Sequence, residues 1–280
     1  MINVFDDIKT GLQQANEYEN GNLTCRTKAL SVINVLVCGI NGKMGKNIVS
    51  LLKDDKEAKI VCGVDLNKGE GKIPVYTSFD KVKEKVDVVI DFSSPAALRG
   101  ELDWAVKNNV PVVIAATGYS EDDLKFIDEC ANKIAIFKTA NFSLGVNLLV
   151  KLVKQAAEAL GEGFDIEIIE KHHNQKVDAP SGTALMLADS ANSAFEDEKN
   201  YLYGRAGSVG KRKNEIGIHA VRGGTIVGEH EVMFAGEDEI ITLSHSARSK
   251  KVFAAGAIKA AKWIVGRPAG KYDMTNVLDN

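Results

Sequence analysis

The stretch INVLVCGINGKMGKNIVSLLK, residues 33–53, decides the fold of this 280-residue chain. It begins with an apolar strand over 33–38 and continues into a helix whose apolar positions recur every four residues: Met44, Ile48, Leu52. Gly39, Gly42 and Gly45 lie between the two. Glycines in such a turn let the backbone approach a pyrophosphate, which rests on the N-terminus of the helix. The stretch therefore predicts a dinucleotide site in a Rossmann-type, doubly wound parallel sheet, although an ordinary tight turn between strand and helix has the same pattern.

A second predicted strand, residues 59–64, ends in Asp65, where a ribose-binding acid is expected after a glycine turn. A carboxylate at this position hydrogen-bonds the ribose hydroxyls and repels a 2′-phosphate, which favours NADH. Lys43 and Lys68 could offset that repulsion and admit NADPH. The choice between NADH and NADPH therefore stays open.

Further apolar stretches continue the parallel sheet: residues 86–92, 110–116 and 134–137. Each ends in small or polar residues, and open parallel sheets bind ligands beyond the carboxyl ends of their strands. We therefore expect Ser93, Thr117 and Asn141 to border the nicotinamide half of the cofactor.

The stretch DIEIIEKHHNQKVDAPSGTAL, residues 165–185, predicts a second site. Its first part alternates apolar and acidic residues as a strand does, and His172 and His173 follow at its end. An imidazole beside the ammonium group of Lys176 is suited to general acid catalysis. Ser181, Gly182 and Thr183 precede a helix expected to begin near Ala184, and free N–H groups and hydroxyls there can receive a carboxylate. A single histidine is more often a satisfied core or surface residue, but this cluster predicts a site for a small anion.

The composition is that of an ordinary globular protein, with 45% hydrophobic residues, 26% charged residues and a formal net charge of −3. A slightly acidic chain has no bulk electrostatic reason to bind nucleic acid or anionic lipid, and no run of about 18 apolar residues is present. The cysteines lack C-x-x-C spacing and indicate a reducing compartment: Cys25, Cys38, Cys62, Cys130. We expect a cytoplasmic protein with no metal site, no nucleic-acid partner and no membrane partner.

The pattern along the chain predicts a second, α+β domain with a mixed or antiparallel sheet. A strongly apolar helix over 144–160 leads into it, and its later strands, read at 217–221, 225–235 and 239–246, suggest mostly antiparallel pairing. An apolar outer face on such a sheet would favour a homo-oligomer. We expect an N-terminal extension of unknown role over residues 1–33. A dinucleotide-binding domain would follow over 34–143, completed by the C-terminal segment 253–280. Residues 144–252 would form a substrate-binding and oligomerisation domain.

Several blocks between Ile33 and Leu278 resemble those of the dihydrodipicolinate reductases, also called 4-hydroxy-tetrahydrodipicolinate reductases: GINGKMG, DFSSP, ATGYS, ANFSLGVN, EKHHNQKVDAPSGTA and GEHEVMFAGEDEIITLSHSA. The His-His-x-x-Lys-x-Asp-x-Pro-Ser-Gly-Thr block is the most specific of these. The resemblance implies reduction of a cyclic, unsaturated dicarboxylate with hydride from NADH or NADPH, in the diaminopimelate route to lysine. It also implies a homotetramer built through the sheets of the second domain.

The resemblance assigns His172 as proton donor or acceptor and Lys176 as a second proton donor. It implies that His173, Gly182 and Thr183 contact the carboxylates of the substrate. Ser181 belongs to the same substrate-binding turn. For the cofactor, the resemblance implies pyrophosphate contacts from six residues: Gly39, Ile40, Asn41, Gly42, Lys43, Met44. It implies a ribose contact from Asp65. It implies nicotinamide contacts from seven residues: Ala115, Ala116, Thr117, Thr139, Ala140, Asn141, Phe142.

The chain departs from this family pattern in two places. Ala115 and Ala116 stand where the family usually has Gly-Thr, and Leu66 stands where some members have the Arg that would favour NADPH. Two alternatives stay open. One is a regulator that binds dinucleotide without turnover and uses the N-terminal segment to contact a partner, although a sensor needs no proton donor. The other is a reductase of a different anionic substrate on the same scaffold.

Overall fold

A computed structural model describes residues 32–69 and 71–279 of the chain. Residues 33–280 group into one compact unit. The N-terminal extension expected from the sequence falls almost entirely outside the described residues. No helix in the described part of the chain is both long and apolar enough to cross a membrane.

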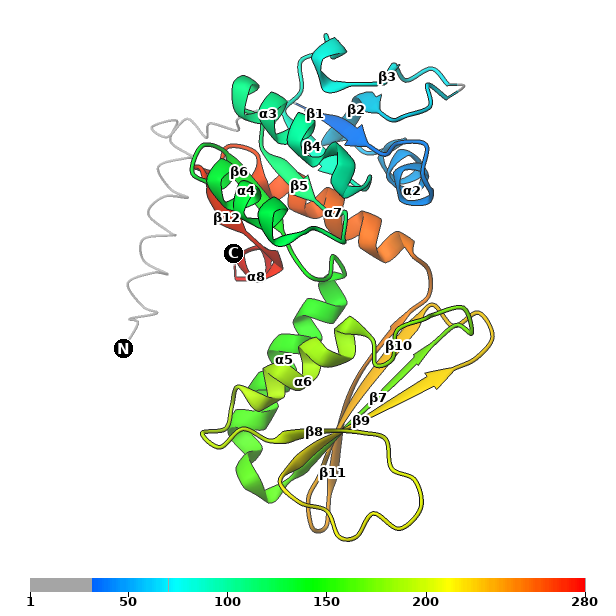
Figure 1. Ribbon diagram of the computed structural model, residues 1–280, viewed down its shortest axis with the longest axis vertical. Helices are drawn as coiled ribbons and strands as arrows, with labels where there is room; N and C mark the ends of the chain where they lie inside the picture. The colour runs from blue at the N-terminus through cyan, green and yellow to red at the C-terminus, as the bar shows by residue number, and fades with distance from the viewer. Residues whose placement is uncertain (1–31, 70, 280) are drawn as a thin grey trace, which may run out of the picture. The chain divides into compact units, whose positions relative to one another are not determined.

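The first sheet has seven strands, and every pairing in it is parallel (Figure 1). Its strands are β1 (Ile33–Cys38), β2 (Ala58–Val64), β3 (Val75–Tyr76), β4 (Val88–Asp91), β5 (Val112–Ile114), β6 (Ala135–Lys138) and β12 (Gly270–Tyr272). Their order across the sheet is β12-β6-β5-β4-β1-β2-β3. The chain reverses direction across the sheet after β3, so β1 and β4 are neighbours, as in doubly wound sheets. The predicted Rossmann-type sheet is confirmed.

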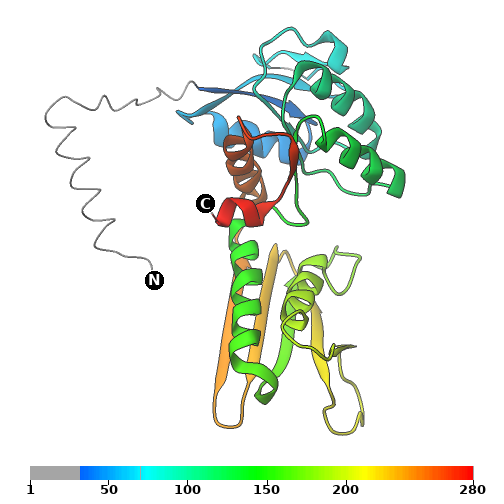
Figure 2. The same cartoon turned by 90° about the vertical axis from the view of Figure 1, so that its left-hand side faces the viewer.

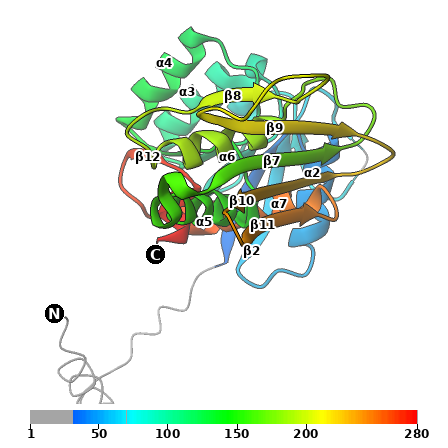
Figure 3. The same ribbon diagram turned by 90° about the horizontal axis from the view of Figure 1, so that it is seen from below.

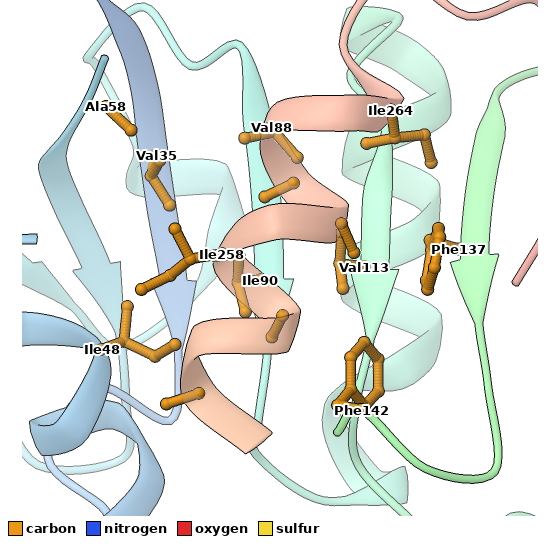
Figure 4. Close-up of a cluster of buried hydrophobic side chains, with 14 of the residues drawn as sticks. Val35, Ile48, Ala58, Val88, Ile90, Val113, Phe137, Phe142, Ile258 and Ile264 are labelled. Carbon is orange, nitrogen blue, oxygen red and sulfur yellow. The ribbon is translucent and has the colours of Figure 1, made fainter. Parts of the chain in front are cut away.

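Helices cover both faces of this sheet. They are α2 (Lys43–Leu52), α3 (Leu98–Asn108), α4 (Glu121–Ala131), α7 (Lys251–Ile264) and α8 (Met274–Leu278), with short 3-10 turns η1 (Phe79–Lys81) and η2 (Pro95–Ala97). Val35 and Val37 of β1 face α2 and α7, whereas Leu36 and Cys38 belong to the core on the α3 and α4 side. Figure 4 shows α7 lying across the strands, with Ile258 among the strand side chains. Burying one such aliphatic side chain contributes roughly 1.5–3 kcal/mol.

The second sheet has five strands in the order β11-β10-β7-β9-β8 (Figure 3). Its strands are β7 (Asp165–His172), β8 (Asn200–Tyr203), β9 (Glu215–Arg222), β10 (Gly228–Ala235) and β11 (Ile240–Ala247). The β10 strand is antiparallel to both β7 and β11, but β9 is parallel to both β7 and β8. The expected second domain with a mixed sheet is therefore confirmed, whereas the expectation that its pairing would be mostly antiparallel was wrong. The chain between the neighbouring strands β7 and β9 passes through a helix and β8, and parallel neighbours need a long crossover of this kind rather than a hairpin.

Two helices pack on one face of the second sheet: α5 (Leu144–Leu160), which runs into the turn η3 (Gly161–Gly163), and α6 (Gly182–Asn192). Figure 2 shows α5, in green, beside the strands of this sheet. Ile166 and Ile168 of β7 share a buried cluster with Val153 of α5 and Leu187 of α6. Every second residue of β7 points into this core, so Glu170 and His172 lie on the same face as Ile166 and Ile168.

Candidate active site

The glycine turn after β1 has the tight geometry that the sequence predicted. Gly39 has a φ of +75°, and an ideal Cβ there would lie 2.9 Å from the carbonyl oxygen of Phe92. A Cβ on Gly45 would lie 2.3 Å from the carbonyl oxygen of Gly39. Gly42 is the N-cap residue of α2 and is exposed. The turn therefore excludes side chains at positions 39 and 45 and leaves the start of α2 open to an anion.

A cavity of about 880 Å³ opens beside this turn. Five of the residues expected at the cofactor line it: Gly39, Asn41, Gly42, Asp65, Ser93. The Asp65 carboxylate accepts hydrogen bonds from the backbone N–H of Asn41, at 3.0 Å, and of Asn67, at 3.2 Å. Each oxygen keeps further capacity to accept a hydroxyl. The turn, the helix terminus and the acid together fit the pyrophosphate and ribose of a dinucleotide.

The other predicted cofactor residues of the turn play different parts. Ile40 is buried against Gly63, so any contact it makes with a ligand would come from its backbone. Lys43 is the first residue of α2 and is exposed, whereas Met44 packs against the core.

The predicted nicotinamide residues follow two neighbouring strands, β5 and β6, which pair Ile114 with Lys138. They therefore lie together at the carboxyl ends of these strands. None of them lines the 880 Å³ cavity in the part of the chain that the structure describes: Ala115, Ala116, Thr117, Thr139, Ala140, Asn141, Phe142. The N–H of Ala115 donates to the carbonyl of Asp91 at 2.8 Å, and Phe142 is buried against Phe137. Thr117 and Ala140 are exposed.

A buried acidic group lies beside the cavity and was not expected from the sequence. Asp91 accepts hydrogen bonds from the Ser93 hydroxyl at 2.5 Å and the Tyr119 hydroxyl at 3.2 Å. Both Glu101 oxygens are buried without a hydrogen-bond partner among the described residues, and burial followed by the charge of Asp91 raises the Glu101 pKa well above its usual value. The ligand atoms of Cys38, Asp91 and Glu101 lie within 4.8 Å of one another, a spacing that could hold a metal ion. Burial raises all three pKa values, which favours a neutral acid and thiol at this position instead.

His172 ends β7 and is 9% exposed. Its Nδ1 lies 2.6 Å from Oε2 of Glu170. Lys176 instead contacts both carboxylate oxygens of Asp178, at 2.8 and 2.9 Å. The charged group in contact with His172 is therefore the Glu170 carboxylate, which was not expected from the sequence. The alternation of β7 explains this, because Glu170 shares the face of His172.

In the turn after β7, some polar groups have hydrogen-bond partners within the protein and others are available to a ligand. Helix α6 begins at Gly182, two residues earlier than expected, because the Ser181 hydroxyl accepts from the N–H of Ala184 and caps it. The Ser181 N–H donates to Glu170, so both groups of Ser181 have partners within the protein. Gly182 is exposed in the first turn. Nδ1 of His173 is buried with no hydrogen-bond partner in the described part of the chain. An orphaned nitrogen of this kind needs a partner, which a bound ligand would supply.

One hydrogen bond joins the two predicted sites. The amide nitrogen of Asn141, after β6, donates to the hydroxyl of Thr183 at 2.9 Å. The side-chain oxygen of Asn141 accepts from the N–H of Ser143 at 2.8 Å, which fixes the orientation of the amide. A residue expected to flank the nicotinamide therefore contacts a residue expected to bind substrate.

Three residues of this site were not predicted to take part in it: Glu170, Arg222 and His230. Glu170 could have been found from its position two residues before His172 on a strand. Arg222 pairs with Glu170 because β9 lies beside β7, with His172 opposite Arg222. His230 lies opposite Glu170 on β10. The register of β7 with β9 and β10 brings Arg222 and His230 to this site, and no local sequence pattern indicates that register.

Two family models match the chain: "Dihydrodipicolinate reductase, N-terminus" over residues 33–142 and "Dihydrodipicolinate reductase, C-terminus" over residues 145–278. This chain belongs to the dihydrodipicolinate reductase family. A 4-hydroxy-tetrahydrodipicolinate reductase of Caldanaerobacter subterraneus is 53% identical over 248 residues, which are 88% of this chain and 98% of the relative. The Clostridium tetani enzyme of the same name is 44% identical, over 89% of this chain and 98% of the relative.

A solved dihydrodipicolinate reductase from a Paenisporosarcina species, described as dipicolinate-bound, has the same fold. Its TM-score to this chain is 0.74, with 27% identity over 88% of this chain and 99% of that protein. Membership of this reductase family, together with the Rossmann-type sheet, implies a nicotinamide dinucleotide cofactor.

Proposed function

We propose that this chain reduces 4-hydroxy-tetrahydrodipicolinate to tetrahydrodipicolinate with NADH or NADPH, in the diaminopimelate route to lysine. The hydrogen bond between Asn141 and Thr183 carries the proposal, because it joins the carboxyl edge of the parallel sheet to the turn that follows the histidines. A reduced dinucleotide at that edge and an anion at that turn would therefore be close together. The names of the relatives support the choice of substrate.

The second site offers recognition for a small dicarboxylate. Lys176, with its side chain 20% exposed, can exchange the Asp178 carboxylate for one of the substrate. The first turn of α6, at Gly182 and Thr183, presents backbone N–H groups to an anion, and the orphaned Nδ1 marks His173 as a further contact. These groups supply positive charge and donors without requiring a metal.

The chemistry divides between the cofactor and the protein. When bound, the reduced nicotinamide supplies a hydride for an electron-poor carbon of the ring, and this hydride together with one proton replaces the 4-hydroxyl group, which leaves as water. The protein orients the substrate through its carboxylates, and His172 exchanges a proton with it. Lys176 stabilises the negative charge that develops on the substrate and serves as a second proton donor.

We further propose NADH as the preferred dinucleotide. The cavity beside the glycine turn is lined by three acids, Asp65, Asp80 and Asp103, and by a single cationic residue among those described, Lys107. A 2′-phosphate would carry additional negative charge into this lining, whereas the ribose hydroxyls of NADH can donate to Asp65.

The organisation expected from the sequence is also part of the proposal. Residues 34–143 with 253–280 would bind the dinucleotide, and residues 144–252 would bind substrate and assemble copies of the chain into a homotetramer. Val221 and Ile240, which are 45% and 64% exposed on strands of the second sheet, support assembly through that sheet. The buried free thiols support a reducing, cytoplasmic location: Cys38, Cys62, Cys130.

The test is turnover on substrate generated in the cuvette by dihydrodipicolinate synthase from pyruvate and aspartate semialdehyde, with NADH and NADPH each followed by absorbance. We expect rapid oxidation that depends on the synthase. Tight cofactor binding without turnover would contradict the proposal. It would favour the regulator, which predicts that deleting residues 1–33 abolishes partner binding, or a reductase of another anion.

A further inference from the structure

Glu170 is a buried carboxylate with a full set of partners at the catalytic histidine. Its side chain is 0% exposed and shares a face of β7 with His172. Both nitrogens at the end of the Arg222 guanidinium donate to it, at 2.8 and 2.7 Å, and the N–H of Ser181 donates at 2.9 Å. Burial raises the Glu170 pKa, but these donors and His172 outweigh burial and hold it below its usual value. Glu170 is therefore ionised at neutral pH.

An ionised carboxylate can only accept hydrogen bonds. The His172 nitrogen that faces Glu170 at 2.6 Å, Nδ1, must therefore carry a hydrogen. In the neutral imidazole the other nitrogen, Nε2, is then the bare one, and proton exchange takes place there. An ideal Cβ built on Gly228 would lie 3.1 Å from this Nε2, so a glycine at that position keeps the nitrogen uncrowded.

The far side of the His172 ring is neutral. The His230 ring stands edge-on to it, with the ring centroids 5.2 Å apart. The Ser181 hydroxyl, which accepts from the N–H of Ala184, also lies 2.9 Å from Nε2 of His230 and forms a hydrogen bond with it. Burial is the first cause that lowers the pKa of His230, to about 4, so this imidazole carries no charge at neutral pH. The charged group in contact with His172 is therefore Glu170, which is paired with Arg222, whereas Lys176 is held on Asp178.

Arg222 also reaches the loop that carries Lys176. Nη2 of Arg222, which donates to Oε1 of Glu170, also donates to the carbonyl oxygen of Asp178 at 2.6 Å. Asp178 is the partner of Lys176. One arginine thus connects the strand of the proton-exchanging histidine to the turn of the second proton donor.

We infer that Glu170 and Arg222 are positioning residues of the reductase: the pair holds His172 as the Nδ1–H tautomer, directs Nε2 to the substrate, and ties the Lys176 turn to the same frame. The catalytic consequence rests on the proposed function, but the tautomer does not. Glu–His pairs of this kind act in other enzymes by holding the ring in one tautomer, and removing the acid leaves the ring in the wrong one.

The tautomer can be measured directly in the full-length protein. We would record ¹⁵N spectra of the imidazole nitrogens, with His172 assigned from the spectrum of His172→Gln. The inference expects protonated Nδ1 and bare Nε2 in the neutral ring. Protonated Nε2 with bare Nδ1 in the unsubstituted protein would overturn it. This measurement needs no variant of Glu170, so it decides the matter even if such variants fold poorly.

The kinetic consequence has a matched control on the same strand. Glu167, on the opposite face of β7, also contacts a histidine and arginines: His219 Nε2 lies 2.7 Å and Arg205 2.9 Å from its carboxylate. Glu167→Gln therefore breaks a comparable charged cluster without touching His172. We expect Glu170→Gln to lower kcat roughly 100-fold with less than about a threefold change in the Kd of NADH, and to lose the single tautomer. We expect Glu167→Gln to keep both kcat and the His172 signals.

Each failure has a separate signature. Equal losses of kcat in the two variants, with the His172 tautomer unchanged in both, would reduce Glu170 to a structural role and refute the inference. The expected tautomer in a protein that shows no turnover would refute the proposed function and leave the role of Glu170 in setting the tautomer intact. Turnover in a protein whose His172 carries the opposite tautomer would refute the role of Glu170 in setting the tautomer and leave the proposed function intact.

Discussion

Gly42 and Gly45 lie in one turn, and the structure predicts that alanine at each has a different effect. At Gly45, which is buried, a Cβ would lie 2.3 Å from one backbone oxygen and 2.4 Å from another, and Cβ atoms do not approach such atoms within 3.0 Å. Backbone would have to move by at least about 0.7 Å. Overpacking of this kind costs about 1–3 kcal/mol, and the clash with backbone places Gly45→Ala at the upper end. For a unit of this size that lowers Tm by roughly 5–10 °C.

Gly42 is exposed, with φ of −69° and ψ of 170°, a conformation that alanine adopts freely. Its Cβ would lie 3.2 Å from the carbonyl oxygen of Gly39, which asks for a shift of only a few tenths of an ångström. Gly42 lines the cavity, however, so a methyl group there would occupy space intended for pyrophosphate. We expect Gly42→Ala to keep Tm within about 2 °C and to raise the Kd of NADH at least roughly tenfold.

The assays are thermal unfolding followed by circular dichroism and NADH titration followed by fluorescence, on both variants and on Gly71→Ala as a control, where a Cβ meets no atom within 4 Å. Unchanged NADH affinity in Gly42→Ala would show that the dinucleotide does not lie on this turn. An unchanged Tm in Gly45→Ala would refute the packing argument instead.

Three other predictions follow from the same geometry. Asp65→Ala should weaken NADH more than NADPH in titrations, because it removes an acceptor for ribose hydroxyls and a charge that repels a 2′-phosphate; an unchanged preference would remove Asp65 from the ribose site. Thr183→Val should raise the KM of the dicarboxylate roughly tenfold with the Kd of NADH unchanged, and equal effects on both would contradict the assignment of Thr183 to the substrate side. Burial lowers the pKa of His230 from 6.5 to about 4, so the unfolded chain binds more protons between these values and the free energy of unfolding falls as pH drops through that window, by about 3 kcal/mol in total. Urea unfolding of His230→Gln should show a flatter pH dependence there, and the same slope in both proteins would exclude His230 as its source.

The local part of the fold could be predicted from the sequence because its signals are contiguous. The strand, turn and helix around Gly39 occupy about twenty residues, and their apolar period and glycines act at short range. The bounds of β1 and α5 agree with the expectation residue for residue. The strand β8, NYLY, lies between polar segments without a clear alternation, and its omission concealed the crossover that makes the second sheet mixed.

The chemistry of the candidate site could be predicted only in part, because sequence patterns identify residues that are close along the chain and not those brought together by strand pairing. His172, Lys176 and the turn at Gly182 lie within eleven residues and were found together. Arg222 is separated from Glu170 by 52 positions, and only the register of β7 and β9 brings them into contact. The contact between His172 and Glu170 was therefore not predicted, because the site was assigned from the residues that follow His172 along the chain, whereas Glu170 precedes it on the same strand face.

In the proposed reaction, His172 and Lys176 carry out proton transfer to a dicarboxylate. The most direct measurement compares NADH oxidation by the unsubstituted protein and by Lys176→Ala on substrate generated by the synthase, with NADH affinity measured for both. We expect turnover in the first, a loss of kcat by roughly 100-fold or more in the second, and equal NADH affinity in both. Normal turnover by Lys176→Ala, or the absence of turnover by the unsubstituted protein, would contradict this proposal.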